Sequence, residues 1–189
     1  MYKVWYIAGA VLLLFGGCVG YTELPEPVKI LRGIPADARS IAIHVLPATP
    51  GSVRNLETSA DLSITLARSI REALARRKPD WRIEIREGQT PPVKTDLALR
   101  SEFLEVDGGS TGMRFWIGFN AGATQSIVQV SILDGAGQEL AASRISHSTM
   151  CPTGLCTDSN EKMLQRNFEG LADEIAQFVI DPTEYAKRK

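Results

Sequence analysis

Two stretches decide the fold: Ser40–Val45, SIAIHV, and Leu62–Arg77, LSITLARSIREALARR. In the first, large apolar residues alternate with smaller or polar ones, a period of two that predicts a half-buried strand. In the second, apolar residues recur every four positions while most arginines fall on the other side, which predicts an amphipathic helix. The helical positions are Leu62, Leu66, Ile70 and Leu74, with Ala67 and Ala75 beside them. Residues 58–61, TSAD, resemble a capping box at the start of this helix.

Further strands and one more helix follow along the chain. The alternating or apolar stretches are a strand around Trp81, Ile83 and Ile85, a strand over 96–106, a hairpin of 126–133 and 139–147 across 134–137, and a closing helix over 163–178 that stops before Pro182. The order of elements is β, α, β, β, β-hairpin, α. This order predicts an α/β (α+β) two-layer sandwich, in which a largely antiparallel sheet of about five strands is covered by two helices on one face.

Length and composition limit the class of protein. The chain has 189 residues, 44% hydrophobic and 23% charged, which are the values of one globular domain. The net charge is −1, and no basic stretch dominates. The sequence therefore predicts no nucleic-acid partner.

The N-terminus predicts export. Lys3 precedes an uncharged run from Val4 to Gly17, which is too short to span a bilayer at ~20 residues but fits the ~7–15 residues of a signal peptide. The run ends in Gly16-Gly17-Cys18, which resembles the lipobox of bacterial lipoproteins, with Phe15 where leucine is usual. This resemblance implies cleavage before Cys18 and attachment of diacylglycerol and palmitate to it. An uncleaved anchor helix and a soluble secreted form are the alternatives.

These features divide the chain into four parts. Residues 1–17 are the expected signal peptide, and 18–38 are the lipidated cysteine and a proline-containing tether. The single α/β domain covers 39–182, and 183–189 form a charged C-terminal tail. Because Val19 rather than aspartate follows Cys18, the inner-membrane retention signal of enterobacterial lipoproteins is absent. We therefore expect the protein in the cell envelope, on the periplasmic face of the outer membrane.

The cysteine count agrees with export. The chain has three cysteines, and assigning Cys18 to lipid leaves Cys151 and Cys156. In an oxidising periplasm, these two are expected to form a disulfide that closes a short loop containing Pro152 and Gly154. His147 with the two cysteines would supply only three zinc ligands, and their spacing matches no zinc template. No metal or other cofactor is predicted.

One segment resembles a known family. Residues 96–106, DLALRSEFLEV, then Gly108-Gly109, then 114–122, RFWIGFNAG, and the strands around Asp134-Gly135 resemble the bacterial domain of unknown function 4410. The resemblance covers roughly residues 40–180, and Asn120 stands where the family often has glycine. It implies a lipoprotein of this layout and carries no assigned activity.

A catalytic reading of the chain is weaker. Residues 108–112, GGSTG, fit the G-x-S-x-G pattern, and Asp134 and His147 follow Ser110 in the order found in α/β-hydrolases. That chemistry needs Ser110 on a tight strand-to-helix turn, whereas the residues after it are apolar and strand-like. No catalytic residue is therefore assigned, and a serine hydrolase using Ser110 remains an alternative.

The segment Arg114–Gly122 is the candidate partner surface. Phe115, Trp116 and Phe119 gather within five residues, and Gly118 and Gly122 permit close backbone approach. The alternative is an edge strand and turn packed under the second helix. The predicted function is a non-enzymatic envelope lipoprotein whose domain binds another envelope protein or itself, with a subunit of an oligomeric secretion or pore assembly as the alternative.

Overall fold

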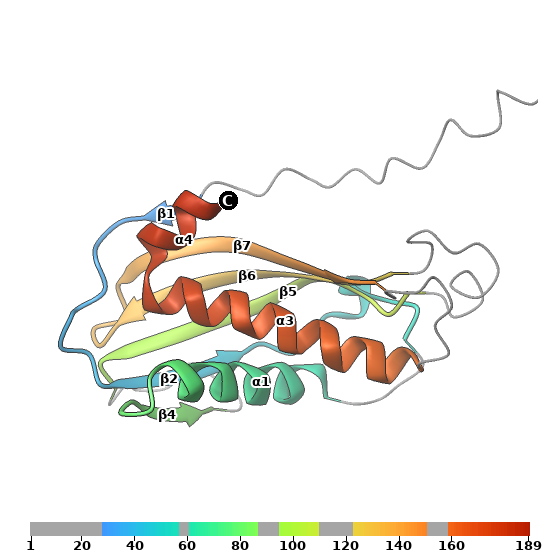
Figure 1. Cartoon of the computed structure of the whole chain (residues 1–189), viewed down its shortest axis with the longest axis horizontal. Coiled ribbons are helices and arrows are strands. Elements are labelled where there is room, and N and C mark those ends of the chain that lie inside the picture. The colour runs from blue at the N-terminus through green and yellow to red at the C-terminus, as the bar shows by residue number, and fades with distance from the viewer. Residues whose placement is uncertain (1–27, 57–60, 87–94, 110–122, 151–158) are drawn as a thin grey trace, which may run out of the picture.

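A computed structural model describes residues 28–56, 61–86, 95–109, 123–150 and 159–189 (Figure 1). Its elements are β1 (Lys29–Ile30), β2 (Ser40–Val45), the 3-10 turn η1 (Pro50–Ser52), β3 (Val53–Arg54), α1 (Leu62–Arg77), β4 (Arg82–Ile85), β5 (Leu97–Asp107), β6 (Thr124–Asp134), β7 (Glu139–Thr149), α3 (Asn160–Ile180) and α4 (Pro182–Arg188). The helices α1 and α3 lie side by side on one face of the sheet (Figure 1). The expected α+β layout of helices over one sheet face is thus confirmed.

The sheet differs from the prediction in strand number and direction. Seven strands are described, in the order β1-β7-β6-β5-β2-β4, with β3 beside β5. The pairs β5–β6, β6–β7 and β1–β7 are antiparallel, whereas β2 runs parallel to β4 and β5, and β3 runs parallel to β5. The expectation of about five largely antiparallel strands is therefore corrected to a mixed sheet. The parallel pair β2–β4 follows from α1, because a helical crossover returns the chain in its original direction.

Helix α1 is capped by a different residue from the one that the capping-box pattern predicts. The side chain of Asp61 accepts hydrogen bonds from the backbone N–H groups of Ser63 and Ile64, at 3.0 and 3.2 Å. Asp61 is therefore the N-cap itself, rather than the far member of a capping box begun by Thr58, which lies outside the described residues. The Ser63 hydroxyl also donates a hydrogen bond to Asp61. This bond, followed by the two backbone bonds, lowers the pKa of Asp61, although burial acts to raise it.

The core lies between the sheet and the two long helices. Leu97 and Leu99 of β5 are paired with Ile41 and Ile43 of β2, and all four are fully buried. The helices contribute the predicted apolar positions, together with others on the same faces: Leu66, Ile70, Ala73 and Leu74 of α1, and Phe168, Leu171, Ile175 and Phe178 of α3. The one error of placement in α1 is Ala75, which is exposed, whereas Ala73 is buried.

The C-terminal residues 183–189, expected as a charged tail, form most of α4. Asp181 accepts a hydrogen bond from the backbone N–H of Glu184 at 2.8 Å, and Pro182 occupies the first turn. Tyr185 is 4% exposed and meets Phe178 of α3 edge-to-face at 5.6 Å between ring centroids. The tail is helical because it has a cap, a proline suited to a first turn and one buried aromatic anchor.

Candidate functional site

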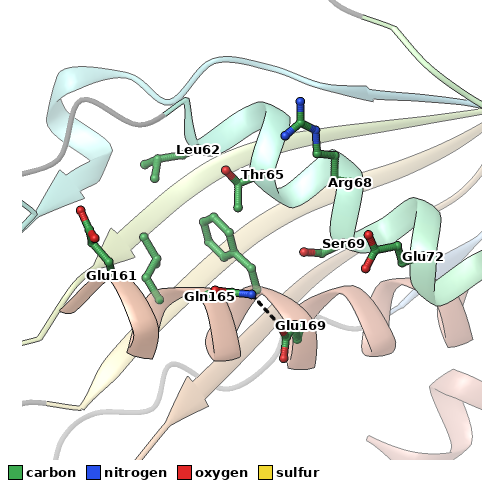
Figure 2. Close-up of a pocket in the computed structure, with 10 residues that line it drawn as sticks. Leu62, Thr65, Arg68, Ser69, Glu72, Glu161, Gln165 and Glu169 are labelled. Carbon is green, nitrogen blue, oxygen red and sulfur yellow. Dashed lines mark hydrogen bonds between the residues drawn. The ribbon is translucent and has the colours of Figure 1, made fainter. Parts of the chain in front are cut away.

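A groove runs between α1 and α3 (Figure 2), with a volume of about 420 Å³. It is lined by Leu62, Thr65, Arg68, Ser69 and Glu72 of α1 and by Glu161, Leu164, Gln165, Phe168 and Glu169 of α3. Leu62, Leu164 and Phe168 are buried and form an apolar floor. The charged residues on its rim are three glutamates and one arginine. An apolar floor under a rim of net negative charge suits an apolar side chain with basic neighbours.

A second polar site ties α4 to α3 and β7 through Glu174. One carboxylate oxygen of Glu174 lies 3.2 Å from Nδ1 of His147. Its other oxygen accepts hydrogen bonds from the Tyr185 hydroxyl at 3.3 Å and from Nζ of Lys189 at 2.6 Å. Glu174 of α3 therefore links this helix to β7 through His147. It also links α3 to the C-terminal end of the chain, through Tyr185 of α4 and Lys189.

The electrostatics of this cluster follow from the partly buried carboxylate. Burial acts to raise the pKa of Glu174, but the hydrogen bonds and positive charges of His147 and Lys189 outweigh it and hold that pKa below its ordinary value of 4.5. Burial, and then the neighbouring Glu174 carboxylate, raise the pKa of the Tyr185 hydroxyl. Tyr185 therefore stays a hydrogen-bond donor to an ionised Glu174 at neutral pH.

Asn167 links α3 to the ends of two strands, and sequence reasoning missed it. Its side chain is fully buried, and Nδ2 donates to the backbone oxygens of His147 at 2.9 Å and Thr124 at 3.2 Å. The same nitrogen lies 3.3 Å from Oγ1 of Thr149. The available signal was an asparagine on an apolar helix face beside Phe168, since a buried amide needs partners.

The structure separates two members of the suggested hydrolase triad. Asp134 ends β6, and its Oδ1 accepts hydrogen bonds from the backbone N–H groups of Ala136 and Gln138 in the hairpin turn. His147 lies opposite Ser126, eight residues away from Asp134 along β6, which is about 26 Å of extended strand. Asp134 therefore cannot orient His147, whose carboxylate partner is Glu174. Ser110 itself lies outside the described residues.

The glycines before Ser110 have a packing role. A Cβ added to Gly108 would lie 2.5 Å from the backbone oxygen of Asn55, and Gly109 has a φ of 71°. Asp107 accepts hydrogen bonds from the Gly109 N–H at 2.8 Å and from Nδ2 of Asn55 at 2.9 Å. The end of β5 therefore requires a small residue at 108 and a left-handed backbone at 109, with no catalytic role needed to explain either.

The other predicted site residues lie outside the described residues. They are Cys18, the pair Cys151 and Cys156, and the candidate partner surface of Arg114, Phe115, Trp116, Gly118, Phe119 and Gly122. Within the parts of the chain that the structure describes, no group of three or more His, Cys, Asp or Glu side chains is arranged to hold a metal ion. In those same parts, no helix has the length and apolar character needed to cross a membrane.

The chain belongs to the family of the domain of unknown function DUF4410, whose pattern matches residues 36–151. This confirms the resemblance found in the sequence. No protein in the curated set matches the chain.

Similar solved structures include a PelC dodecamer from Paraburkholderia phytofirmans, with 13% identity, a TM-score of 0.49, and coverage of 77% of this chain and 96% of that one. A variant PelC dodecamer from the same organism has 15% identity, a TM-score of 0.48, and coverage of 77% and 93%. A candidate lipoprotein from Caulobacter crescentus has 18% identity, a TM-score of 0.36, and coverage of 77% and 89%.

Proposed function

We propose that this chain is a bacterial envelope lipoprotein, anchored through Cys18, whose domain binds an envelope protein or a second copy of itself and catalyses no reaction. The observation that carries the proposal is the uncharged run Val4–Gly17 ending directly at Cys18. The first strand begins at Lys29, so the ten residues 19–28 can span at most about 35 Å when extended. That length lets the domain stand clear of a membrane surface while it remains tethered.

The polar clusters of the domain support a binding role over an enzymatic one. Glu174 joins α3, β7 and α4, while Asp134 stabilises the turn between β6 and β7. Asp96 accepts hydrogen bonds from the backbone N–H of Arg39 and from the Ser40 hydroxyl, both at 2.8 Å. Each of these acidic side chains has a structural partner within the fold.

The anchor is tested by metabolic labelling with palmitate in a bacterial host. We expect the wild-type chain and the control Cys151→Ser to be labelled and Cys18→Ala to lose the label. Globomycin, which blocks the lipoprotein signal peptidase, should cause the precursor to accumulate. Label that persists in Cys18→Ala would overturn the anchor.

The location is tested by separating inner and outer membranes by density. We expect the labelled chain in the outer membrane, and recovery with the inner membrane would contradict that location.

The absence of catalysis is tested with a fluorophosphonate probe that reacts with activated serines. We expect no label on the wild-type chain. A label that is lost in Ser110→Ala and retained in the neighbouring control Thr111→Ala would establish the hydrolase alternative instead.

A further inference from the structure

The outer edge of β7 is only partly covered. On one side, β7 pairs with β6 from Glu139 to Thr149. On the other side, its described partner is β1, which pairs only with Ala141 and Ala142 (Figure 1). Beyond β1, residues 143–149 have no partner strand on this side among the residues that the structure describes. An uncovered edge of this length is a template for another strand.

The register shows which backbone groups face outward. Lys29 lies opposite Ala142, and Leu31 donates its N–H to the backbone oxygen of Leu140 at 2.8 Å. In an antiparallel pair, residues that bond to the neighbouring strand alternate with residues that face away from it. The even-numbered residues of β7 therefore direct their backbone groups away from β6. Past β1 these are Arg144, Ser146 and Ser148, and the two serines are exposed.

The chain's own upstream segment is unsuited to this edge. If β1 were extended in its register, Pro27 would lie opposite Arg144 and Pro25 opposite Ser146. Both positions belong to the set whose N–H groups would donate to β7, and proline has no N–H. The sequence of this segment therefore lacks the N–H donors that pairing with β7 would need at these two positions.

We propose that the occupant is β7 of a second copy, paired antiparallel about a two-fold axis at Ser146. This deepens the proposed binding role and rests on it, naming the second copy as partner. In this register, Arg144 lies opposite Ser148 of the partner copy, and Ser146 lies opposite the same residue of the partner copy. Every outward-facing residue then meets another outward-facing residue, and each such pair can exchange two N–H···O bonds. The uncovered segment is therefore complementary to itself.

The side chains and β1 favour this register. Arg144 lies opposite Ser148, so no like charges are opposed, and serine pairs are favourable across strands. A shift of two residues toward β1 would place Ser148 of the partner copy opposite Ala142, where Lys29 already lies. β1 therefore limits how far the second strand can slide, and in the proposed register the partner chain leaves the edge after Ser148.

Cysteine cross-linking in membranes tests the pairing directly, in the full-length chain with Cys151→Ser and Cys156→Ser. In the proposed register, the Cα atoms of two copies of residue 146 are about 5.5 Å apart, which lies within the range for a disulfide. Those of residue 148 are offset by four residues, about 13 Å. We expect oxidation to convert Ser146→Cys to a species of twice the monomer mass, whereas the matched control Ser148→Cys stays monomeric. Equal cross-linking of both, none of either, or a product of another mass would overturn the proposal.

A charge on the edge gives a second test by light scattering in detergent. We expect the wild-type chain to have the mass of two copies and Ser146→Lys, which opposes two lysines across the axis, to have half that mass with an unchanged melting temperature. Gln125→Lys is the control, because Gln125 lies opposite Ser148 on β6, one strand inside the edge. A monomeric wild-type chain, or equal effects of both lysines, would overturn the pairing.

Palmitate label is measured on the same samples, so that failure of the pairing can be told apart from failure of the lipid anchor. A labelled wild-type monomer would overturn the pairing alone. An unlabelled wild-type dimer would overturn the lipid anchor alone.

Discussion

The imidazole ring of His147 on β7 lies directly against Gly170 on α3. A Cβ added to Gly170 would overlap Nε2 of His147 and would lie 2.5 Å from Cε1 and 2.7 Å from Cδ2. The other ring nitrogen, Nδ1, is 3.2 Å from Glu174, one turn further along α3. Gly170 therefore provides the space in which the ring packs, and Glu174 holds the ring there. This relationship explains a glycine inside a 21-residue helix, where glycine costs ~1 kcal/mol relative to alanine.

Gly170→Ala is expected to destabilise the protein by about 1–3 kcal/mol, although alanine is the better helix former. The physical reason is overpacking, because the new methyl group forces either the ring or the helix to move. The free energy of unfolding is measured by urea denaturation. In a His147→Ala background the ring is gone, so the same substitution should be neutral or stabilising by up to about 1 kcal/mol. An equal loss in both backgrounds would contradict the contact between the two residues.

Glu174 is expected to make stability depend on acid pH. Its pKa is lower in the folded protein than the ordinary 4.5, so its contribution is present above that pH and is lost as the pH falls through the folded value. Because the cluster is partly exposed, we expect Glu174→Gln to cost only about 0.5–1 kcal/mol at pH 6–7. The cost should disappear well below pH 4. Urea denaturation at several pH values measures this difference.

The control for Glu174 is Glu169→Gln on the same helix. Glu169 is exposed and accepts a hydrogen bond from Gln165 one turn earlier, at 3.2 Å. We expect this variant to keep the acid-dependent loss of stability that the wild-type protein shows. If Glu174→Gln and wild type lose stability in parallel as the pH falls, the pH dependence arises from other carboxylates.

Periodicity in the sequence was sufficient for the elements that bury a continuous face. Leu66, Ile70 and Leu74 mark α1 because each turn of the helix places one of them on the core. The two-residue strands β1 and β3 could not be found in this way, since two residues show no alternation. The parallel direction of β5 relative to β2 depends on long-range pairing, which no local pattern specifies.

The polar contacts were harder to predict from the sequence than the core. The order and spacing of residues along the chain group His147 with Asp134, Cys151 and Cys156, yet the structure pairs it with Glu174, 27 residues later. That pairing exists only because α3 crosses β7 at Gly170. Asn167 likewise gains its partners from two strand ends that meet only in the fold.

Cys151 and Cys156, which lie outside the described residues, are expected to be joined in the exported protein. Intact mass after alkylation should show two additional modified thiols only when the protein is reduced first. The disulfide closes a short loop, so its removal in Cys151→Ser/Cys156→Ser should cost less than the ~3 kcal/mol expected for a loop of 15 residues. Two thiols that react without reduction in periplasmic material would refute the pairing.

Trp116 provides the test of the predicted partner surface, which also lies outside the described residues. Phe115, Ile117 and Phe119 surround it in the sequence, and no amphipathic period assigns all of them to one core. We expect Trp116→Ala to keep the wild-type melting temperature and to retain the Ser146→Cys cross-link, because the proposed β7 pairing uses another part of the chain. Complexes with other envelope proteins, captured from membranes by mild cross-linking, should be weakened by ~2 kcal/mol or more, about 30-fold in affinity, since a buried aromatic anchor often contributes that much. The control is Thr111→Ala, measured in the same way, which lies outside the predicted surface and leaves its aromatic side chains in place. If Trp116→Ala instead lowers the free energy of unfolding by ~3–5 kcal/mol and leaves the captured complexes unchanged, Trp116 is a core residue and the segment is not the partner surface.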